Sequence, residues 1–343
     1  MKHTDWIVSP APFILTRPTV SQMSLFTFLT TIPYFIMLIF EKDYAAVINI
    51  FVTVAGAILA ELITHHLDYK DMLADGSVII AGIVTGLLLP NTLGVLVCFI
   101  VSFSGFLVAR AIFGGNGCYW MNPVAVSVCI AFISFPSIFP EVQVSTDSLQ
   151  TIGNAFGALK LDHFPQIAAD QSITQFCNTE FLSHLGIKLP EGYLTLFWNS
   201  PSVIPAFRYN VFILIASIIL IAMNVIDWVV PLFFLFIYGL CVYLFSLMSV
   251  SGHIGGGDIL FALLTSGILF IAFYVLPDTS TNPKTFPGKV FSGSVAGFLA
   301  FFLCGPGSSS VGCVFIVLIS NTVNTVIEYL EDIWAHHLTG AVS

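Results

Sequence analysis

The sequence contains few charged residues. Only 8% of its 343 residues are Asp, Glu, Lys or Arg, against roughly 25% in a typical soluble domain, whereas 57% are hydrophobic. Ten Lys and Arg residues are outnumbered by 19 Asp and Glu residues and form no basic cluster, which argues against nucleic acid as a partner. The composition therefore predicts an all-α integral membrane protein that contacts membrane lipid.

Several cofactor and targeting signatures are missing from the sequence. The seven cysteines include no C-x-x-C pair, which argues against an iron–sulfur or zinc site within this chain. None of the eight histidines lies deep inside an apolar run, which argues against a pair of haem ligands. Neither an NADH-binding fingerprint nor a signal-peptide cleavage site is visible. If the protein carries electrons, other proteins have to deliver them.

Ten apolar runs are visible, in two groups of five. They cover residues 23–40, 44–64, 77–90, 92–113, 122–139, 210–226, 228–250, 258–276, 290–304 and 311–329. The polar segment between the groups contains no run long enough to cross a bilayer. We therefore expect an N-terminal segment (1–22), a first five-helix repeat (23–139), an extramembrane loop (140–209), a second five-helix repeat (210–330) and a C-terminal tail (331–343).

Five runs per group would start the second group on the opposite side of the membrane, as in inverted repeats. The third runs share a pattern, because DGSVIIAGIVTGLLLPN (75–91) and GGDILFALLTSGILFIAFYVLPD (256–278) both have an early Asp, a central Thr and Gly, and a final Leu-Pro. Val78 to Pro90 would span about 20 Å, short of the roughly 30 Å hydrocarbon core. We expect either a short central helix facing a protein-lined cavity or a kinked helix that continues past Pro90.

The distribution of Lys and Arg near the ends of the runs predicts a cytoplasmic N-terminus. In that orientation Lys42 and Arg208 lie outside, and the cations inside are Lys2, Arg17, Lys70, Arg110, Lys284 and Lys289. The 140–209 segment would then lie outside the membrane, on the opposite side from the N-terminus.

A glycine-rich stretch, IFGGNGCYWMNP (112–123), lies between two runs. Gly114, Gly115 and Gly117 would let the backbone approach a ligand such as a nucleotide or flavin closely, and Asn122 offers both a donor and an acceptor. An equally good interpretation is a tight turn in which Pro123 begins the next helix.

Three carboxylates are candidates for an ion pathway. Asp75 and Asp278 lie at the edges of apolar runs, where helix capping is the alternative role. Glu61 lies about one turn inside its run, where an ionisable group is costly and a functional role is expected, although its side chain could instead reach the membrane interface.

Taken together, these stretches resemble the RnfD/NqrB family, whose members are membrane subunits of the Rnf electron-transfer complex and of the sodium-pumping NADH:quinone reductase. The resemblance extends over nearly the whole chain. It rests on Ser9-Pro10, DGSVIIAGIVTGLLLP, FGGNGCYWMNP, PDTSTNPKTFPGKVFSGSVAGF and LISNTVNTVIEY, in this order. It implies a ten-span subunit of the bacterial inner membrane with inverted repeats, which assembles with other membrane and peripheral subunits.

The resemblance also implies flavin cofactors. FMN would be joined through its phosphate to a hydroxyl after the fifth run, riboflavin would be held non-covalently, and electrons would cross the membrane while sodium ions or protons move. Alignment of VSTDSLQT (144–151) with the family's S-T-A-T-P-L places Ser148 at the acceptor threonine, and a shifted register would use Thr146. Serine can form the phosphoester, but Asp147 adds negative charge beside it, so a degenerate site without covalent flavin is the alternative.

Two further departures from the family pattern occur. Tyr119 replaces the first asparagine of the glycine-rich motif, where it could stack on a flavin ring or lie at the membrane interface. GPGSSSVG (305–312) replaces a turn that often carries an acidic residue. The predicted function is a flavin-carrying subunit of an ion-translocating electron-transport complex. The alternatives are a non-redox channel or transporter for a small solute, and a structural subunit without cofactor.

Overall fold

The computed structural model describes residues 18–64, 75–115, 117–139, 167–185, 189, 191–200, 202–247, 258–307 and 312–340. These residues form helices and no strand. The first group comprises α1 (Val20–Phe40), α2 (Tyr44–Thr64), α4 (Ser77–Leu88), α5 (Val95–Phe106) with its π-helical continuation η1 (Leu107–Ala111), and α6 (Pro123–Ser134). The second group comprises α11 (Asn210–Ala222), α12 (Val229–Leu247), α13 (Ile259–Thr265), α14 (Ile268–Phe270), η5 (Ile271–Val275), α15 (Phe286–Cys304) and α16 (Gly312–Gly340).

Helices therefore occupy all ten apolar runs, and the chain is a multi-pass membrane protein. By length and hydropathy, α1, α2, α12, α15 and α16 can each cross a bilayer. The apolar helices α4, α5 with η1, α6 and α11 are shorter. Helix α16 continues without a break to Gly340, past the boundary predicted at residue 331. The ten crossings and the inverted relation of the groups remain predictions.

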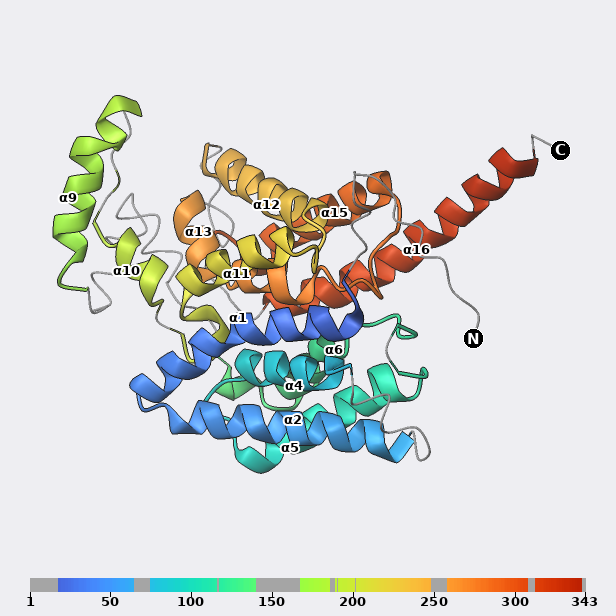
Figure 1. Ribbon diagram of the computed structural model, residues 1–343. Helices are drawn as coiled ribbons and strands as arrows, with labels where there is room; N and C mark the ends of the chain where they lie inside the picture. Colours follow the sequence, from blue (N-terminus) through green and yellow to red (C-terminus); the bar gives the residue numbers. More distant parts are fainter. Residues whose placement is uncertain are drawn as a thin grey trace, which may run out of the picture.

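Two short helices, α9 (Asp170–Glu180) and α10 (Tyr193–Trp198), lie at one end of the bundle, and the C-terminal end of α16 lies at the opposite end (Figure 1). We name these the loop end and the cavity end. The buried Asp170 joins α9 to the residues around α10, because its carboxylate accepts hydrogen bonds from the Gly192 and Thr195 backbone N–H groups at 3.2 and 3.0 Å. Short one-turn helices lie in the same part of the chain at Pro136–Ile138, Leu182–Leu185 and Pro205–Phe207.

Both third segments are short, as predicted. Helix α4 ends at Leu88 ahead of Pro90 and lines a cavity, which confirms the half-helix interpretation over a continuous kinked helix. In the second group the helix breaks at Gly267, whose φ is 73°. A Cβ atom there would lie 2.6 Å from the ring of Phe207, so both the backbone conformation and the packing require glycine.

The two groups repeat some local features. Asp75 accepts a hydrogen bond from the N–H of Ser77 at 2.9 Å, and Asp258 accepts one from the N–H of Leu260 at 3.0 Å. Each third segment therefore begins with an Asp that accepts from the backbone two residues later. The second helix packs against the fourth in both groups, as α2 against α5 and α12 against α15. The fourth also packs against the fifth in both groups. These recurrences are those expected of two related halves.

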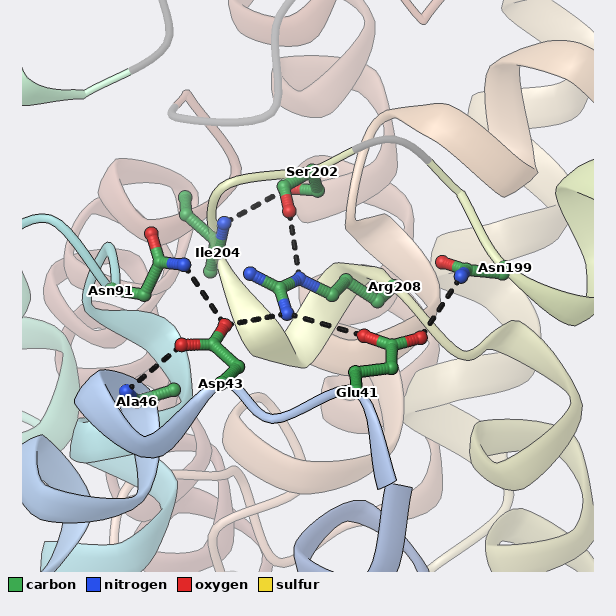
Figure 2. Close-up of polar contacts among 8 residues, drawn as sticks. All are labelled: Glu41, Asp43, Ala46, Asn91, Asn199, Ser202, Ile204 and Arg208. Atoms are coloured by element: carbon green, nitrogen blue, oxygen red, sulfur yellow. Dashed lines mark hydrogen bonds and ion pairs between the residues drawn. The ribbon is translucent and has the colours of Figure 1, made fainter. Parts of the chain in front are cut away.

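An ion-pair cluster joins the two groups at the loop end (Figure 2). Arg208, which precedes α11, contacts Asp43 at 2.7 Å and Glu41 at 3.5 Å, and Asn91 donates to Asp43 at 2.9 Å. Burial alone would raise the pKa of Asp43, but the hydrogen bonds from Asn91 and Arg208 outweigh it and lower the pKa. The turn between α1 and α2 is thereby attached to the segment that enters the second group.

Glycine permits the closest helix packing in the first group. A Cβ atom at Gly86 of α4 would lie 2.6 Å from the Ile50 Cα of α2, and one at Gly82 would lie 2.8 Å from the Val54 Cα. Small residues at such contacts allow backbones to approach in membranes, where dispersion rather than the hydrophobic effect drives association. The position of α4 beside the cavity therefore depends on these two glycines.

We predict that Gly86→Ala lowers the free energy of unfolding by about 1–3 kcal/mol, because the methyl group overpacks the contact with α2. Thermal unfolding of the detergent-solubilised chain would measure the change. Gly239→Ala in α12 is the matched control, because a Cβ atom there meets only Ile259 Cγ2, at an ordinary 3.4 Å. Equal melting temperatures for Gly86→Ala and the wild type would contradict the prediction.

Candidate functional site

A cavity of about 350 Å³ lies between the two groups at the cavity end. Its walls come from the first turns of α1, α4 and α6, from η1, and from the segments that follow α11 and η5. The lining residues with polar groups or aromatic rings include Ser77, Arg110, Tyr119, Asn122, Tyr274 and Asp278. Both groups of helices thus contribute to one polar space.

A buried ion pair forms one side of this space. Arg110 and Glu61 are 1% and 0% exposed, and their Nε and Oε1 atoms are 3.3 Å apart. Arg110 also donates to the Ser77 hydroxyl at 2.7 Å, and that hydroxyl donates to Asp75 at 2.8 Å. The Glu61 side chain is therefore buried inside the protein and paired with Arg110. The second carboxylate oxygen of Glu61 has no hydrogen-bond partner among the described residues.

Asp278 forms the other side, in the segment between η5 and α15. It accepts hydrogen bonds from the Tyr119 hydroxyl at 2.9 Å and from the Asn122 amide at 3.1 Å, and its second oxygen accepts from the Ser280 N–H at 3.0 Å. The side chain is partly exposed to the cavity but surrounded by protein, and this burial raises the pKa of the carboxyl group despite the hydrogen bonds. A role as a helix cap would not account for the hydrogen bonds that Asp278 accepts from the first group of helices.

Asn122 joins the two groups of helices. Its side-chain oxygen caps α6 by accepting from the Val124 N–H at 2.9 Å, while its amide nitrogen donates to the Val275 carbonyl at 3.2 Å and to Asp278. The N-cap preference of asparagine before Pro123 explains why a helix begins here. Asn122 lines the cavity, although its side chain is already occupied by contacts within the protein.

The glycine-rich stretch forms a tight turn. Gly114, Gly115 and Gly117 have φ angles of 100°, 90° and 82°, which other residues rarely adopt. Of the three, only Gly117 lines the cavity, and a Cβ atom there would meet nothing within 4 Å. The structure therefore supports the turn interpretation for Gly114 and Gly115, and leaves Gly117 as the position that borders open space.

Arg110 and Tyr119 are site residues whose role the sequence reasoning missed. From the sequence, Arg110 served only as one of the cations that predict the orientation in the membrane. Tyr119 was expected only to stack on a flavin ring or to lie at the membrane interface. Tyr119 is 7% exposed, and its ring centroid lies 5.9 Å from the Arg110 guanidinium carbon, within the range of a cation–π contact. The sequence offers one signal for the ion pair. Arg110 lies inside an apolar run, 49 positions after Glu61, which lies inside another. Ser148 and Thr146 lie outside the described residues.

Comparison with known proteins places these features in a family. The sequence model of the NQR2, RnfD, RnfE family matches residues 7–333. A relative from Actinobacillus succinogenes, named as the D component of an ion-translocating oxidoreductase complex, is 25% identical over 92% of this chain and 93% of its own length. A relative from Buchnera aphidicola with the same name is 23% identical over 90% of this chain and 92% of its own length.

Another relative carries a more specific name. It comes from Clostridium ljungdahlii and is named as the D component of a proton-translocating ferredoxin:NAD(+) oxidoreductase complex. It is 21% identical over 96% of this chain and 95% of its own length. The likeness to all three relatives extends over both groups of helices and the segment between them.

We predict that Arg110→Met lowers the free energy of unfolding by about 3–5 kcal/mol, because it leaves the Glu61 carboxylate buried without its cation. The double variant Arg110→Met, Glu61→Gln is expected to regain part of this loss. Thermal unfolding of both variants and of Glu61→Gln completes the cycle. Additive losses in the double variant would show that the two side chains do not interact.

We also predict that Asp278 makes stability depend on pH. Because its pKa is higher in the folded chain, stability decreases as pH rises from about 3.9, the unfolded value, towards the folded pKa. In Asp278→Asn this component is absent, so the melting temperature should fall less steeply with pH. Parallel pH profiles of wild type and Asp278→Asn would refute the assignment.

Proposed function

The chain belongs to the NQR2, RnfD, RnfE family, and on that basis we propose that it is a flavin-carrying membrane subunit of an ion-translocating electron-transport complex. The observation that carries the proposal is the polar cavity between the two groups, which brings an ion pair and the Asp278 carboxylate together inside a membrane protein. Ionisable groups buried inside membrane proteins are costly and mark ion or substrate pathways. The relatives' names support assembly into a multi-subunit complex and a role in ion translocation.

We propose that a flavin ring binds in this cavity. A volume of about 350 Å³ lies within the range of small-molecule sites, roughly 300–1,000 Å³. Tyr274 offers an aromatic surface, and the space beside Gly117 is open. Arg110 and Ser77 add a polar wall, although both are already bonded within the protein. These four residues would hold riboflavin or the ring of FMN. A bound flavin would supply the one- and two-electron chemistry that the side chains lack.

Asp278 is the residue that we propose for coupling ions to electrons. It faces the cavity and has a raised pKa, and its contacts with Tyr119 and Asn122 connect it to the first group of helices. A change of charge in the cavity would strengthen or weaken the hydrogen bonds that Asp278 accepts from Tyr119 and Asn122. Glu61 and Asp75 act through Arg110 and Ser77, which they hold in place.

We propose that the cavity end faces the cytoplasm of a bacterium and that the loop end lies outside its inner membrane. Arg110, Lys284 and Lys289 lie near the cavity end, whereas Lys42 and Arg208 lie at the loop end, as positively charged residues would in this orientation. Residues 140–166, with the candidate attachment site, would then be outside, and electrons would pass from one face of the membrane to the other.

The experiment that tests this function begins with the chain expressed in its own host together with the flavin-attaching enzyme. We expect a fluorescent band in a denaturing gel and an added FMN mass on Ser148 in the peptide that covers Val144 to Thr151. Ser148→Ala should abolish both signals, and Thr146→Ala should retain them.

The other outcomes separate the alternatives. A mass on Thr146 would show that the attachment position is wrong but that the chain carries flavin. A peptide without added mass, together with no flavin in an acid extract of the native protein, would contradict the flavin proposal. Solute flux in vesicles would then distinguish a channel from a structural subunit.

A further inference from the structure

Helix α9 exposes large apolar side chains although most of its residues are polar. Ile173 and Phe176 are 42% and 57% exposed, and Phe181, which directly follows the helix, is 66% exposed. Ile173 and Phe176 are three positions apart and therefore neighbours on the helix surface. The rings of Phe176 and Phe181 meet edge to face, with their centroids 6.1 Å apart. We name these three side chains the α9 apolar patch, and a continuous exposed patch of this kind marks a contact surface.

One side of α9 is fixed to the rest of the protein. Asp170 and Thr174 lie one turn apart and are buried, and the Thr174 hydroxyl donates to Asp170 at 2.9 Å. Asn178, a further turn along, exchanges two hydrogen bonds of 2.8 Å with the backbone of Leu189, which packs against the main hydrophobic core. We name this the inner side of α9. These contacts fix the rotation of the helix, so the exposure of the α9 apolar patch is a property of the fold.

The two flanks of the inner side differ in polarity. With about 100° between successive residues, Ile173 and Phe176 lie on one flank, whereas Gln171 and Gln175 lie on the other. Both glutamines are exposed. The polarity of α9 therefore changes from one flank to the other.

The outward side of α9, opposite the inner side, carries Ser172 and Thr179, both exposed. A protein that capped the end of the bundle would meet this polar side first. Whatever covers the α9 apolar patch has to approach along one flank instead. A flat surface that runs alongside the helix axis, past the end of the bundle, has this geometry.

The direction of α9 identifies that surface. Figure 1 shows α9 running crosswise to α1 and α2, beside the loop end of the bundle. Because α1 and α2 are long and apolar enough to cross a bilayer, a helix crosswise to them runs along the plane of the membrane. Exposed aromatic residues lie at the same end, namely Tyr44 at the start of α2 and Trp198 at the end of α10, which packs against α9. Tyr and Trp gather where hydrocarbon meets water, so the loop end lies at this boundary.

We propose that α9 lies in the membrane interface at the loop end, with the α9 apolar patch inserted among phospholipid chains and the glutamine flank in water. Interfacial helices bury one apolar side at the boundary between head groups and chains. Helix α9 contains Asp170 and Glu180 and no Lys or Arg, so the burial of apolar area stabilises this position without attraction to anionic lipid. The proposal rests on the membrane class of the chain and requires no flavin.

Nitroxide labels on the full-length chain in phosphatidylcholine vesicles test the proposal. Phe176→Cys and Gln175→Cys would each be made together with Cys118→Ser and Cys177→Ser, because the other five cysteines are buried. Oxygen concentrates in lipid, whereas a nickel chelate stays in water. We expect the ratio of oxygen to nickel accessibility to be severalfold higher at position 176 than at position 175. Both positions are exposed, so the fold should accept either label.

Two further labels provide the references. Phe51→Cys, at an exposed position of α2, reports lipid, and Thr179→Cys, on the outward side of α9, reports water. The label at 176 should resemble the first and the label at 175 the second. Equal nickel accessibility at 175 and 176 would place both flanks in water and overturn the proposal. A label at 176 that neither reagent reaches would show a protein contact, such as a second copy of the chain, and would also overturn it.

Lipid composition supplies a second test. The difference between positions 175 and 176 should persist when phosphatidylglycerol is added and when the salt concentration is raised, because α9 has no cation to be screened. A difference that appears only with anionic lipid at low salt would contradict apolar insertion. Neither result depends on FMN at the Val144 to Thr151 peptide, so failure of this proposal and failure of the flavin proposal are distinguishable.

Discussion

The contacts of Asn122 are those on which the arrangement of the two groups depends. In an apolar environment every backbone polar group at a helix end needs a partner within the protein. Asn122 meets this requirement for two ends at once, because it caps α6 and donates to the Val275 carbonyl at the end of η5. Its backbone N–H faces the side chain of Asn321 in α16, and it donates to that side-chain oxygen when the amide is turned to match its neighbours. The first group, the broken helix and the last helix are therefore positioned by one residue.

The cavity follows from this arrangement. The segment that follows η5 brings Asp278 to the cavity, and the first residue of α4, Ser77, lines it from the other group. Arg110 and Asp278 lie in the walls of one cavity, with Tyr119 in contact with both. At the loop end the Arg208 cluster closes the opposite side with contacts between the same two groups. Ion pairs hold the halves together at the loop end, and the hydrogen bonds of Asn122 and Tyr119 do so at the cavity end. Glycines set the close contacts of α2 with α4 and of α12 with α15.

Much of the fold could be predicted from the sequence, whereas less of the site could. The ten apolar runs became helices with edges shifted by a few residues, because hydropathy and length act locally. Asn122, from the glycine-rich motif, and Asp278, from the edge of a run, were named as candidates and line the cavity, while Glu61, from inside a run, contacts Arg110 in its wall. The pairing of Arg110 with Glu61, and of Tyr119 with Asp278, joins residues 49 and 159 positions apart. No local pattern specifies such contacts.

The sequence by itself determined the membrane class, the helical segments and the family, because each follows from local composition or from ordered motifs along the chain. Only the tertiary structure decided which polar residues meet. That outcome depends on the rotation and depth of each helix, which are set by close contacts such as Gly82 and Gly86 against α2. A helix turned by one residue would present a different face to the cavity, and the same side chains would then lie in lipid.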